Sequence, residues 1–232
     1  MIVTLTPVKT ITSRALVVTT AALAALAMTT GSASAHVEPG TPVAHAEAPP
    51  ADDLAAWAES TSAVVDVPRR ALLAYGAADL ALRESCGLTW NTLAAIGDVE
   101  SDHGRFGEAR LDEEGVAQPL IIGLPLDGRP GIMRIGDSDD GALDGDREFD
   151  RAVGPMQFIP GTWAEFGVDG DGDGAANPHD LDDAALATAH HLCAGGRDLT
   201  DGADWWEALY GYNRSLPYGQ RVHEVAGALA ES

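Results

Sequence analysis

The stretch from Arg105 to Asp150 constrains the fold most strongly. It is dense in Gly, Asp and Pro and contains one short apolar run, PLIIGLPL. Such residues favour turns over the interiors of helices and strands, so at most one small hairpin is expected there. A loop of this length in a compact domain is usually functional. The flanking sequence has helical periodicity, which predicts a mainly helical domain with one long irregular region.

Helical segments are expected on both sides of that region. Before it, one helix begins with Asp66 as a cap and Pro68 in its first turn, and a second begins after Thr89 and runs to Gly104. After it, a helix begins at Thr162, where TWAE has the spacing of a capping box. Further helices are expected from Asp182 or Asp183 to Ala194, over Trp205–Tyr210, and over Tyr218–Ala230.

The first 35 residues have the pattern of a secretory signal peptide. Lys9 and Arg14 precede the apolar run Ala15–Met28, and a small-residue cleavage site ends at Ala35. The run is short for a membrane span, and an uncleaved N-terminal anchor is the alternative. We therefore expect an exported protein that is secreted or associated with the cell wall, with no stable insertion in the membrane after cleavage.

Residues 36–62 are rich in Pro, Ala and acidic side chains. Such a composition is typical of a linker, here with a helical turn near Trp57. Residues 63–232 then remain, which is enough chain for one domain with a hydrophobic core.

The exported part of the chain is strongly acidic. Two of the 14 basic residues and none of the 36 acidic residues precede residue 36, so the rest carries a formal charge of −24. This charge disfavours nucleic acid and anionic lipid as partners. A neutral or cationic ligand, or bound metal cations, would suit it better.

Cys86 and Cys193 are the two cysteines of the chain. An even number in an oxidising compartment favours a disulfide, which would close a loop of about 100 residues and contribute on the order of 4 to 5 kcal/mol. Two buried free thiols are the alternative. The spacing offers no CxxC motif for a redox or metal site.

Glu100 is distinguished from the acids around it by its helical phase. Leu93, Ile96 and Glu100 are spaced i, i+3 and i+7, so Glu100 projects from the apolar face, whereas Asp98 and Asp102 point to solvent. Burial raises the pKa of a carboxylic acid, as a general acid near neutral pH requires. The alternative is a glutamate that reaches solvent at the helix end or is satisfied by the backbone beyond it.

A glycosidase usually has a second carboxylate, and the spacing does not select one among Asp144, Asp146 and Asp150.

Four motifs occur in order along the chain: AAIGDVESDHG, AVGPMQFIPGTW, DGDGDG followed by DDAALATAHHLC, and YGYNRSLPYGQRV. Over Leu72 to about Val225 the sequence resembles the lysozyme-like lytic transglycosylases, nearest to the membrane-bound lytic transglycosylase B-like group as found in actinobacteria.

This resemblance implies a mainly α, lysozyme-like α+β fold and a monomer that acts on peptidoglycan glycan strands. It implies Glu100 as the catalytic residue and a set of substrate-binding residues: Ser101, Met156, Gln157, Phe158, Tyr212 and Asn213. Glu100 would protonate the oxygen between MurNAc and GlcNAc and then deprotonate the MurNAc 6-hydroxyl. A 1,6-anhydro product would form without a cofactor.

Two other functions are compatible with the sequence. A lysozyme-type muramidase would use Glu100 with water and an aspartate such as Asp150. A non-catalytic, calcium-dependent wall-binding module would keep the fold without the reaction.

The sequence DGDGDGAANPHD, residues 169–180, fits a twelve-residue, EF-hand-like calcium loop. Its ligands would be Asp169, Asp171, Asp173, the carbonyl of Ala175, Asn177 or a water, and Asp180. Asp182 or Asp183 could replace Asp180 or cap the next helix, and an acidic turn without metal is the alternative. The resemblance favours a structural Ca²⁺. The run from Asp137 to Asp146 fits no standard loop and is expected to be solvated.

Overall fold

The computed structural model describes residues 37–232. The predicted signal peptide at residues 1–35 lies outside the described residues. Within the described part, none of the helices combines the length and the apolar character that crossing a membrane requires.

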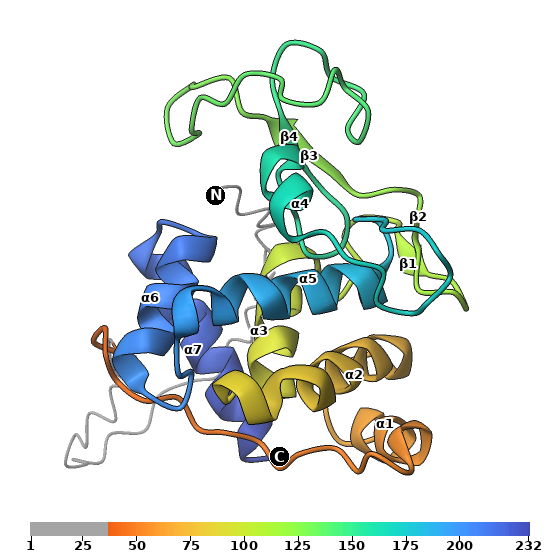
Figure 1. The fold of residues 1–232 in the computed structure, drawn as a ribbon, viewed down its shortest axis with the longest axis vertical. Helices are drawn as coiled ribbons and strands as arrows, with labels where there is room; N and C mark the ends of the chain where they lie inside the picture. The colour runs from red at the N-terminus through yellow and green to blue at the C-terminus, as the bar shows by residue number, and fades with distance from the viewer. Residues whose placement is uncertain (1–36) are drawn as a thin grey trace, which may run out of the picture. The chain divides into compact units, whose positions relative to one another are not determined.

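The described chain is mainly helical, with two small sheets, as predicted (Figure 1). The helices are α1 (Leu54–Ser62), α2 (Arg69–Cys86), α3 (Trp90–Ser101), α4 (Pro160–Phe166), α5 (Leu181–Cys193), α6 (Gly202–Tyr212) and α7 (Leu216–Ala230), with a 3-10 turn at Ala194–Gly196. The strands are β1 (Arg110–Leu111), β2 (Ala117–Gln118), β3 (Ile122–Pro125) and β4 (Arg151–Val153). They form two antiparallel pairs, β1–β2 and β3–β4, where we expected one hairpin.

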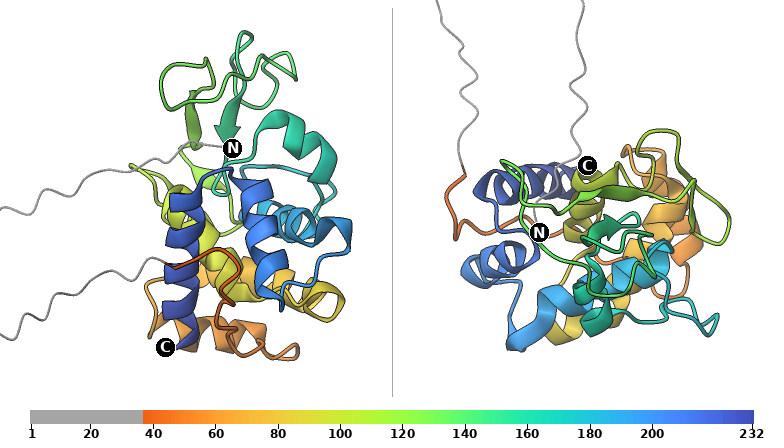
Figure 2. Two further views of the ribbon diagram at one scale, coloured as in Figure 1. Left: turned by 90° about the vertical axis from the view of Figure 1, so that its left-hand side faces the viewer. Right: turned by 90° about the horizontal axis from the view of Figure 1, so that it is seen from above.

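Helix α3 lies at the centre of the helical part. It packs against α2, α5 and α7 (Figures 1 and 2). Ten of its twelve residues are buried, as is typical of a helix surrounded by others. Leu93 and Ile96 of α3 join Leu72 and Tyr75 of α2 and Leu181 of α5 in one core cluster. The end of α3 is therefore held firmly from several sides.

The segment predicted as a linker is instead part of the fold. Residues 37–53 cross the helices, in orange in Figure 1, and α1 includes the helical turn expected near Trp57. Trp206 Nε1 donates a hydrogen bond to the Thr41 carbonyl (3.0 Å), and Asn91 Nδ2 donates one to the Ala44 carbonyl (2.9 Å). Val43 is buried as well. The composition of the segment does not predict these contacts, because the residues that bind it lie far along the chain.

Several predicted helix ends are also displaced. Asp66 does not cap α2 but pairs with Arg105 at 3.1 Å. Helix α3 ends at Ser101, before the predicted Gly104, because Asp102 and His103 adopt left-handed conformations. Helix α4 begins at Pro160, so TWAE lies inside it and forms no capping box. Such boundaries depend on local backbone geometry that periodicity does not resolve.

The predicted disulfide is present between Cys86 and Cys193, which are 107 residues apart in sequence. It joins the last residue of α2 to the last residue of α5. The two helices also pack against each other, so the covalent link closes one end of their interface.

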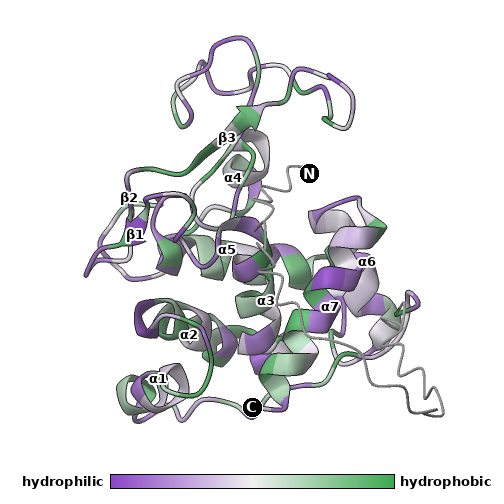
Figure 3. Cartoon of the chain, turned by 180° about the vertical axis from the view of Figure 1, so that it is seen from behind, coloured by the Kyte–Doolittle hydropathy of each residue, from purple (hydrophilic) through white to green (hydrophobic). Residues whose placement is uncertain are grey.

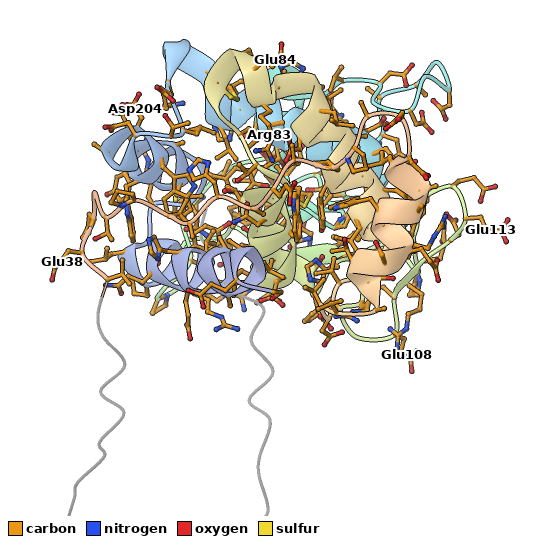
Figure 4. The ribbon with its side chains drawn as sticks, turned by 90° about the horizontal axis from the view of Figure 1, so that it is seen from below. Glu38, Arg83, Glu84, Glu108, Glu113 and Asp204 are labelled. Carbon is orange, nitrogen blue, oxygen red and sulfur yellow. A yellow bond between two sulfur atoms is a disulfide. The ribbon has the colours of Figure 1, made fainter. Side chains whose placement is uncertain are left out.

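Acidic side chains lie mostly at the surface, as Glu38, Glu84, Glu108 and Glu113 do in Figure 4. Asp79 is an exception, because it is fully buried. Its carboxylate pairs with Arg83 on the same helix and accepts a hydrogen bond from the Trp90 backbone N–H (2.6 Å). This buried charge is therefore paired, and it satisfies the first N–H of α3.

Candidate active site

Glu100 occupies the last turn of α3, and its side chain is buried as the helical phase predicts. It is 2% exposed, whereas Asp98 is half-buried and Asp102 is exposed. Its Oε1 atom has no hydrogen-bond partner within residues 37–232. Because burial disfavours the charged form, the pKa of Glu100 is raised to about 8. The carboxyl is therefore mostly protonated at neutral pH.

Two tyrosines lie close to this carboxyl. The phenol of Tyr218, in the first turn of α7, partly offsets the rise in the pKa of Glu100, although the two groups make no hydrogen bond of standard geometry. Burial and the charge of Glu100 raise the pKa values of Tyr212 and Tyr218 well above the usual value. Both phenols thus stay protonated and can donate hydrogen bonds.

Tyr218 was not predicted as a site residue from the sequence. Its position at the start of the helix that follows the Tyr-Asn pair could have indicated it. Ser215 caps this helix by accepting from the Tyr218 N–H (3.4 Å), which brings the tyrosine into the first turn.

The turn from Gly154 to Phe158 connects β4 to α4 and carries an unusual residue, Gln157. Its φ is +52°, in the left-handed region that residues other than Gly seldom adopt. Gln157 is fully buried, and its Nε2 donates to the Gly154 carbonyl (2.8 Å) while Oε1 lacks a partner among the described residues. Strained and unsatisfied residues of this kind concentrate at functional sites.

Two predicted site residues hold this turn in place. Ser101, next to Glu100, donates a hydrogen bond from Oγ to the Pro155 carbonyl (2.6 Å) and accepts one from the Gly104 N–H (2.8 Å). Tyr212 donates from its hydroxyl to the Met156 carbonyl (2.6 Å). The structure thus ties the turn to the ends of α3 and α6 through the adjacent carbonyls of Pro155 and Met156.

Met156 and Phe158 differ from the expectation that they line a substrate groove. Their side chains are 0% and 1% exposed and belong to the main hydrophobic core. The ring of Phe158 packs edge-on against Trp163 and Tyr212. The structure therefore buries these two side chains in the hydrophobic core.

Asn213 follows α6 as its C-cap and is 2% exposed. Its Oδ1 has no partner within the described chain. Buried polar atoms are nearly always hydrogen-bonded, yet Glu100, Gln157, Asn213 and Tyr218 each leave one such atom free. These four come from α3, the 154–158 turn, the end of α6 and the start of α7.

Among residues 37–232, no second carboxylate is close enough to Glu100 to contribute to its raised pKa. Asp150, the candidate for a muramidase, is buried, and its two oxygens accept from the backbone N–H (2.8 Å) and the hydroxyl (2.7 Å) of Ser138. Asp144 accepts from the backbone N–H groups of Asp146 and Arg151.

The acidic loop brings together a different set of carboxylates from the one predicted. Oxygens of Asp169, Asp171 and Asp183 lie within 4.8 Å of one another. Asp173 is not part of this group and accepts from the N–H of Ala175 (2.8 Å).

Asp180 serves as the N-cap of α5 by accepting from the Asp182 N–H (2.8 Å). Asp183, which the sequence offered as an alternative to Asp180, is the third member of the cluster. Three carboxylates offer the hard oxygen ligands that Ca²⁺ prefers, so the group fits that ion. Burial and the charges of Asp171 and Asp169 raise the pKa of Asp183, and a bound cation would relieve this repulsion.

A second acidic group consists of Asp137, Asp139 and Asp150, whose oxygens also lie within 4.8 Å of one another. Asp137 and Asp139 are half-buried and accept from backbone N–H groups of their own loop. Within the run expected to be solvated, Asp137 and Asp139 are thus partly exposed, whereas Asp144 is buried.

Comparisons with known proteins agree with part of the predicted resemblance. Residues 149–206 match the family model described as "Transglycosylase SLT domain". No curated protein matches the chain. Similar solved structures include the Escherichia coli lytic transglycosylase Slt35 in complex with bulgecin A, at 15% identity and a TM-score of 0.44, covering 76% of this chain and 78% of that one.

Slt35 in complex with calcium gives the same identity and coverage with a TM-score of 0.43. The family match begins just before β4 and ends within α6. The part of the chain that carries the Gly154–Phe158 turn and the acidic loop is therefore similar to a transglycosylase SLT domain.

Proposed function

We propose that the protein is a lytic transglycosylase that cleaves the MurNAc–GlcNAc β-1,4 bonds of peptidoglycan and leaves 1,6-anhydro-MurNAc ends. The observation that carries this proposal is the buried Glu100 carboxyl, with a pKa of about 8 and a free Oε1 atom. A general acid must be protonated at the working pH and free to reach its substrate. The match to the transglycosylase SLT domain supports the choice of substrate.

In the proposed reaction, Glu100 donates its proton to the glycosidic oxygen as the bond to the MurNAc anomeric carbon breaks. The acetamido group of the same MurNAc stabilises the positive charge that develops on the sugar. The Glu100 carboxylate then takes the proton of the MurNAc 6-hydroxyl, whose oxygen bonds to the anomeric carbon. The free GlcNAc 4-hydroxyl and the 1,6-anhydro ring are the products, and water is not consumed.

The surrounding residues suit these two steps. The Tyr218 phenol lies beside Glu100 and, as a donor, stabilises the carboxylate form that acts as the base. Ser101 and Tyr212 fix the turn that presents Gln157. The free oxygens of Gln157 and Asn213 can accept hydrogen bonds from sugar hydroxyl or acetamido N–H groups.

The absence of a carboxylate beside Glu100 in the described chain favours this reaction over hydrolysis by a lysozyme-type muramidase, in which Asp150 would assist. Asp150 already accepts two hydrogen bonds from Ser138. A non-catalytic wall-binding module would have no need of a buried, protonated and partly unpaired glutamic acid, which costs stability.

Product analysis by mass spectrometry tests the proposal. Purified sacculi treated with the protein should release muropeptides with 1,6-anhydro ends, and Glu100→Gln should lower the rate by about two to four orders of magnitude. Reducing ends would instead establish the muramidase. Binding to sacculi without release of soluble fragments by either protein would establish the binding module.

We also propose that Ca²⁺ binds Asp169, Asp171 and Asp183 and has a structural role. The convergence of three carboxylates supports the site, and catalysis by Glu100 requires no cofactor. The protein is proposed to act as a monomer outside the cytoplasm, at the cell wall, as a member of the B-like group found in actinobacteria. N-terminal sequencing of the exported protein tests whether the signal peptide is removed after Ala35.

A further inference from the structure

A cavity lies between β3 and the loop that precedes β4. It is a shallow depression, largely open to solvent, of about 430 Å³, and it is lined by Ile122, Asp144, Gly145, Asp146, Arg147 and Arg151. Its volume falls in the range of ligand sites. Strand β4 begins at Arg151 and leads directly into the Gly154–Phe158 turn (Figure 1), so the lining residue Arg151 shortly precedes this turn in sequence.

Most of the charges around this cavity are already paired within the protein. Arg151 forms an ion pair with Asp146 (2.8 Å) and donates to the Gly123 carbonyl (3.2 Å). Asp144 accepts from the backbone N–H groups of Asp146 (2.9 Å) and Arg151 (2.6 Å).

Arg147 is different, because its exposed guanidinium has no ion-pair partner within residues 37–232. It is therefore a free positive charge in a chain with a large excess of acids, and it is complementary to a carboxylate.

Ile122 is the apolar side chain of the lining and is 41% exposed. Leu120 and Leu124, its alternate neighbours along the same stretch, lie outside the lining and are each 46% exposed. Figure 3 shows β3 as a hydrophobic strand. Single exposed apolar residues are common, but a row of them marks a binding surface more often.

The intervening Gly123 faces the other way. A Cβ atom at Gly123 would lie 3.1 Å from Gln157 Oε1, so the cavity and Gln157 lie on opposite sides of the same strand. A ligand that passes the edge of this two-stranded sheet could contact both.

We propose that this cavity binds the peptide stem of the glycan strand, with a stem carboxylate on Arg147 and its small apolar side chains against Ile122. This inference rests on the proposed function, because it names a further part of the same substrate. Peptidoglycan stems carry free carboxylates and methyl side chains, which match the free cation and the exposed apolar row. A stem of four to five residues spans roughly 13 to 18 Å when extended, enough to cross one strand of a sheet.

The test compares peptide-bearing glycan strands with strands from which an amidase has removed the peptides. Arg147→Glu should lower kcat/KM on the peptide-bearing strands by roughly fivefold, as expected for reversal of an exposed ion pair. It should leave the rate on the stripped strands unchanged. Ile122→Ser should act in the same direction, and Arg147→Lys should retain most of the wild-type preference.

Arg110→Glu is the matched control, because Arg110 is also exposed but lies outside the cavity. It changes the net charge equally and should affect the two substrates alike. An equal effect of Arg147→Glu on both substrates would overturn the proposed peptide-stem site. It would not contradict the proposed cleavage of the glycan strand.

A binding measurement separates this inference from the proposed function. Calorimetry with a synthetic stem tetrapeptide and the Glu100→Gln protein requires no catalysis. Binding that is weakened by Arg147→Glu and by high salt, but not by Arg110→Glu, supports the site even if the wild-type protein cleaves neither strand. Absence of binding to the protein with Arg147 intact would overturn it, whatever the outcome on glycan.

Discussion

The hydroxyl of Tyr212 donates a 2.6 Å hydrogen bond to the backbone carbonyl of Met156, which lies 56 residues earlier in the chain. Tyr212 is 3% exposed, so this bond is shielded from solvent. It connects the end of α6 to the turn that presents Gln157, and the position of Gln157 therefore depends on a side chain from another helix.

Tyr212→Phe tests this relationship. Loss of the hydrogen bond should lower the free energy of unfolding by about 1 kcal/mol and kcat/KM by about tenfold, because the turn loses its anchor. Tyr210→Phe is the control, since Tyr210 is on the same helix but 59% exposed. Equal, small effects of both changes on kcat/KM would show that the anchor is not needed for activity.

The pH dependence of kcat/KM reports the protonation of Glu100. As the general acid, Glu100 must be protonated, so the rate should fall as pH rises through about 8. The Tyr218 phenol lowers the pKa of Glu100, so Tyr218→Phe should move this fall to higher pH. A midpoint that stays unchanged in Tyr218→Phe would contradict the contact between the two groups.

Glu100 should also make the stability of the protein depend on pH. Its pKa is raised on folding, so the folded state binds more protons than the unfolded state between about 4.5 and 8, and stability falls as pH rises through this window. Above it, Glu100→Gln should be more stable than wild type, by at most about 5 kcal/mol. Chemical denaturation at pH 4 and pH 9 measures the difference, which should vanish at pH 4.

Calcium should raise the melting temperature, because it binds the folded loop in preference to the unfolded chain. At one hundred times the dissociation constant, the gain is about 2.7 kcal/mol. Asp183→Asn should abolish the shift, whereas Asp180→Asn should keep it, since asparagine also caps a helix. A shift lost only in Asp180→Asn would restore the ligand set predicted from the loop spacing.

Gly154, the first residue of the Gly154–Phe158 turn, lies against Pro178 near the end of the acidic loop. Its φ is +76°, and a Cβ atom there would lie 1.8 Å from the Pro178 carbonyl oxygen. Gly154→Ala should therefore cost about 3 kcal/mol or more. Gly107→Ala, with φ +64° and no atom within 4 Å, should cost only about 1 to 2 kcal/mol. Denaturant titrations that give equal losses would show that the close contact can relax.

Features encoded by short-range spacing could be read from the sequence. The helical phase of Leu93, Ile96 and Glu100 predicted which acid of its segment is buried, because side-chain direction in a helix follows from spacing alone. The pairing of Cys86 with Cys193 followed from their number. The mainly helical architecture followed from the periodicity on both sides of the Gly- and Asp-rich region.

What only the tertiary structure decided depends on contacts between distant residues. Residues 37–53 are bound by side chains such as Trp206 and Asn91. The composition of residues 37–53 does not predict these contacts. Asp183 joins the acidic cluster because Asp180 is used as a helix cap. Tyr218 lies beside Glu100 because α7 packs along α3. In each case, the energy that selects the arrangement comes from packing and hydrogen bonds across the core, not from the residues next in sequence.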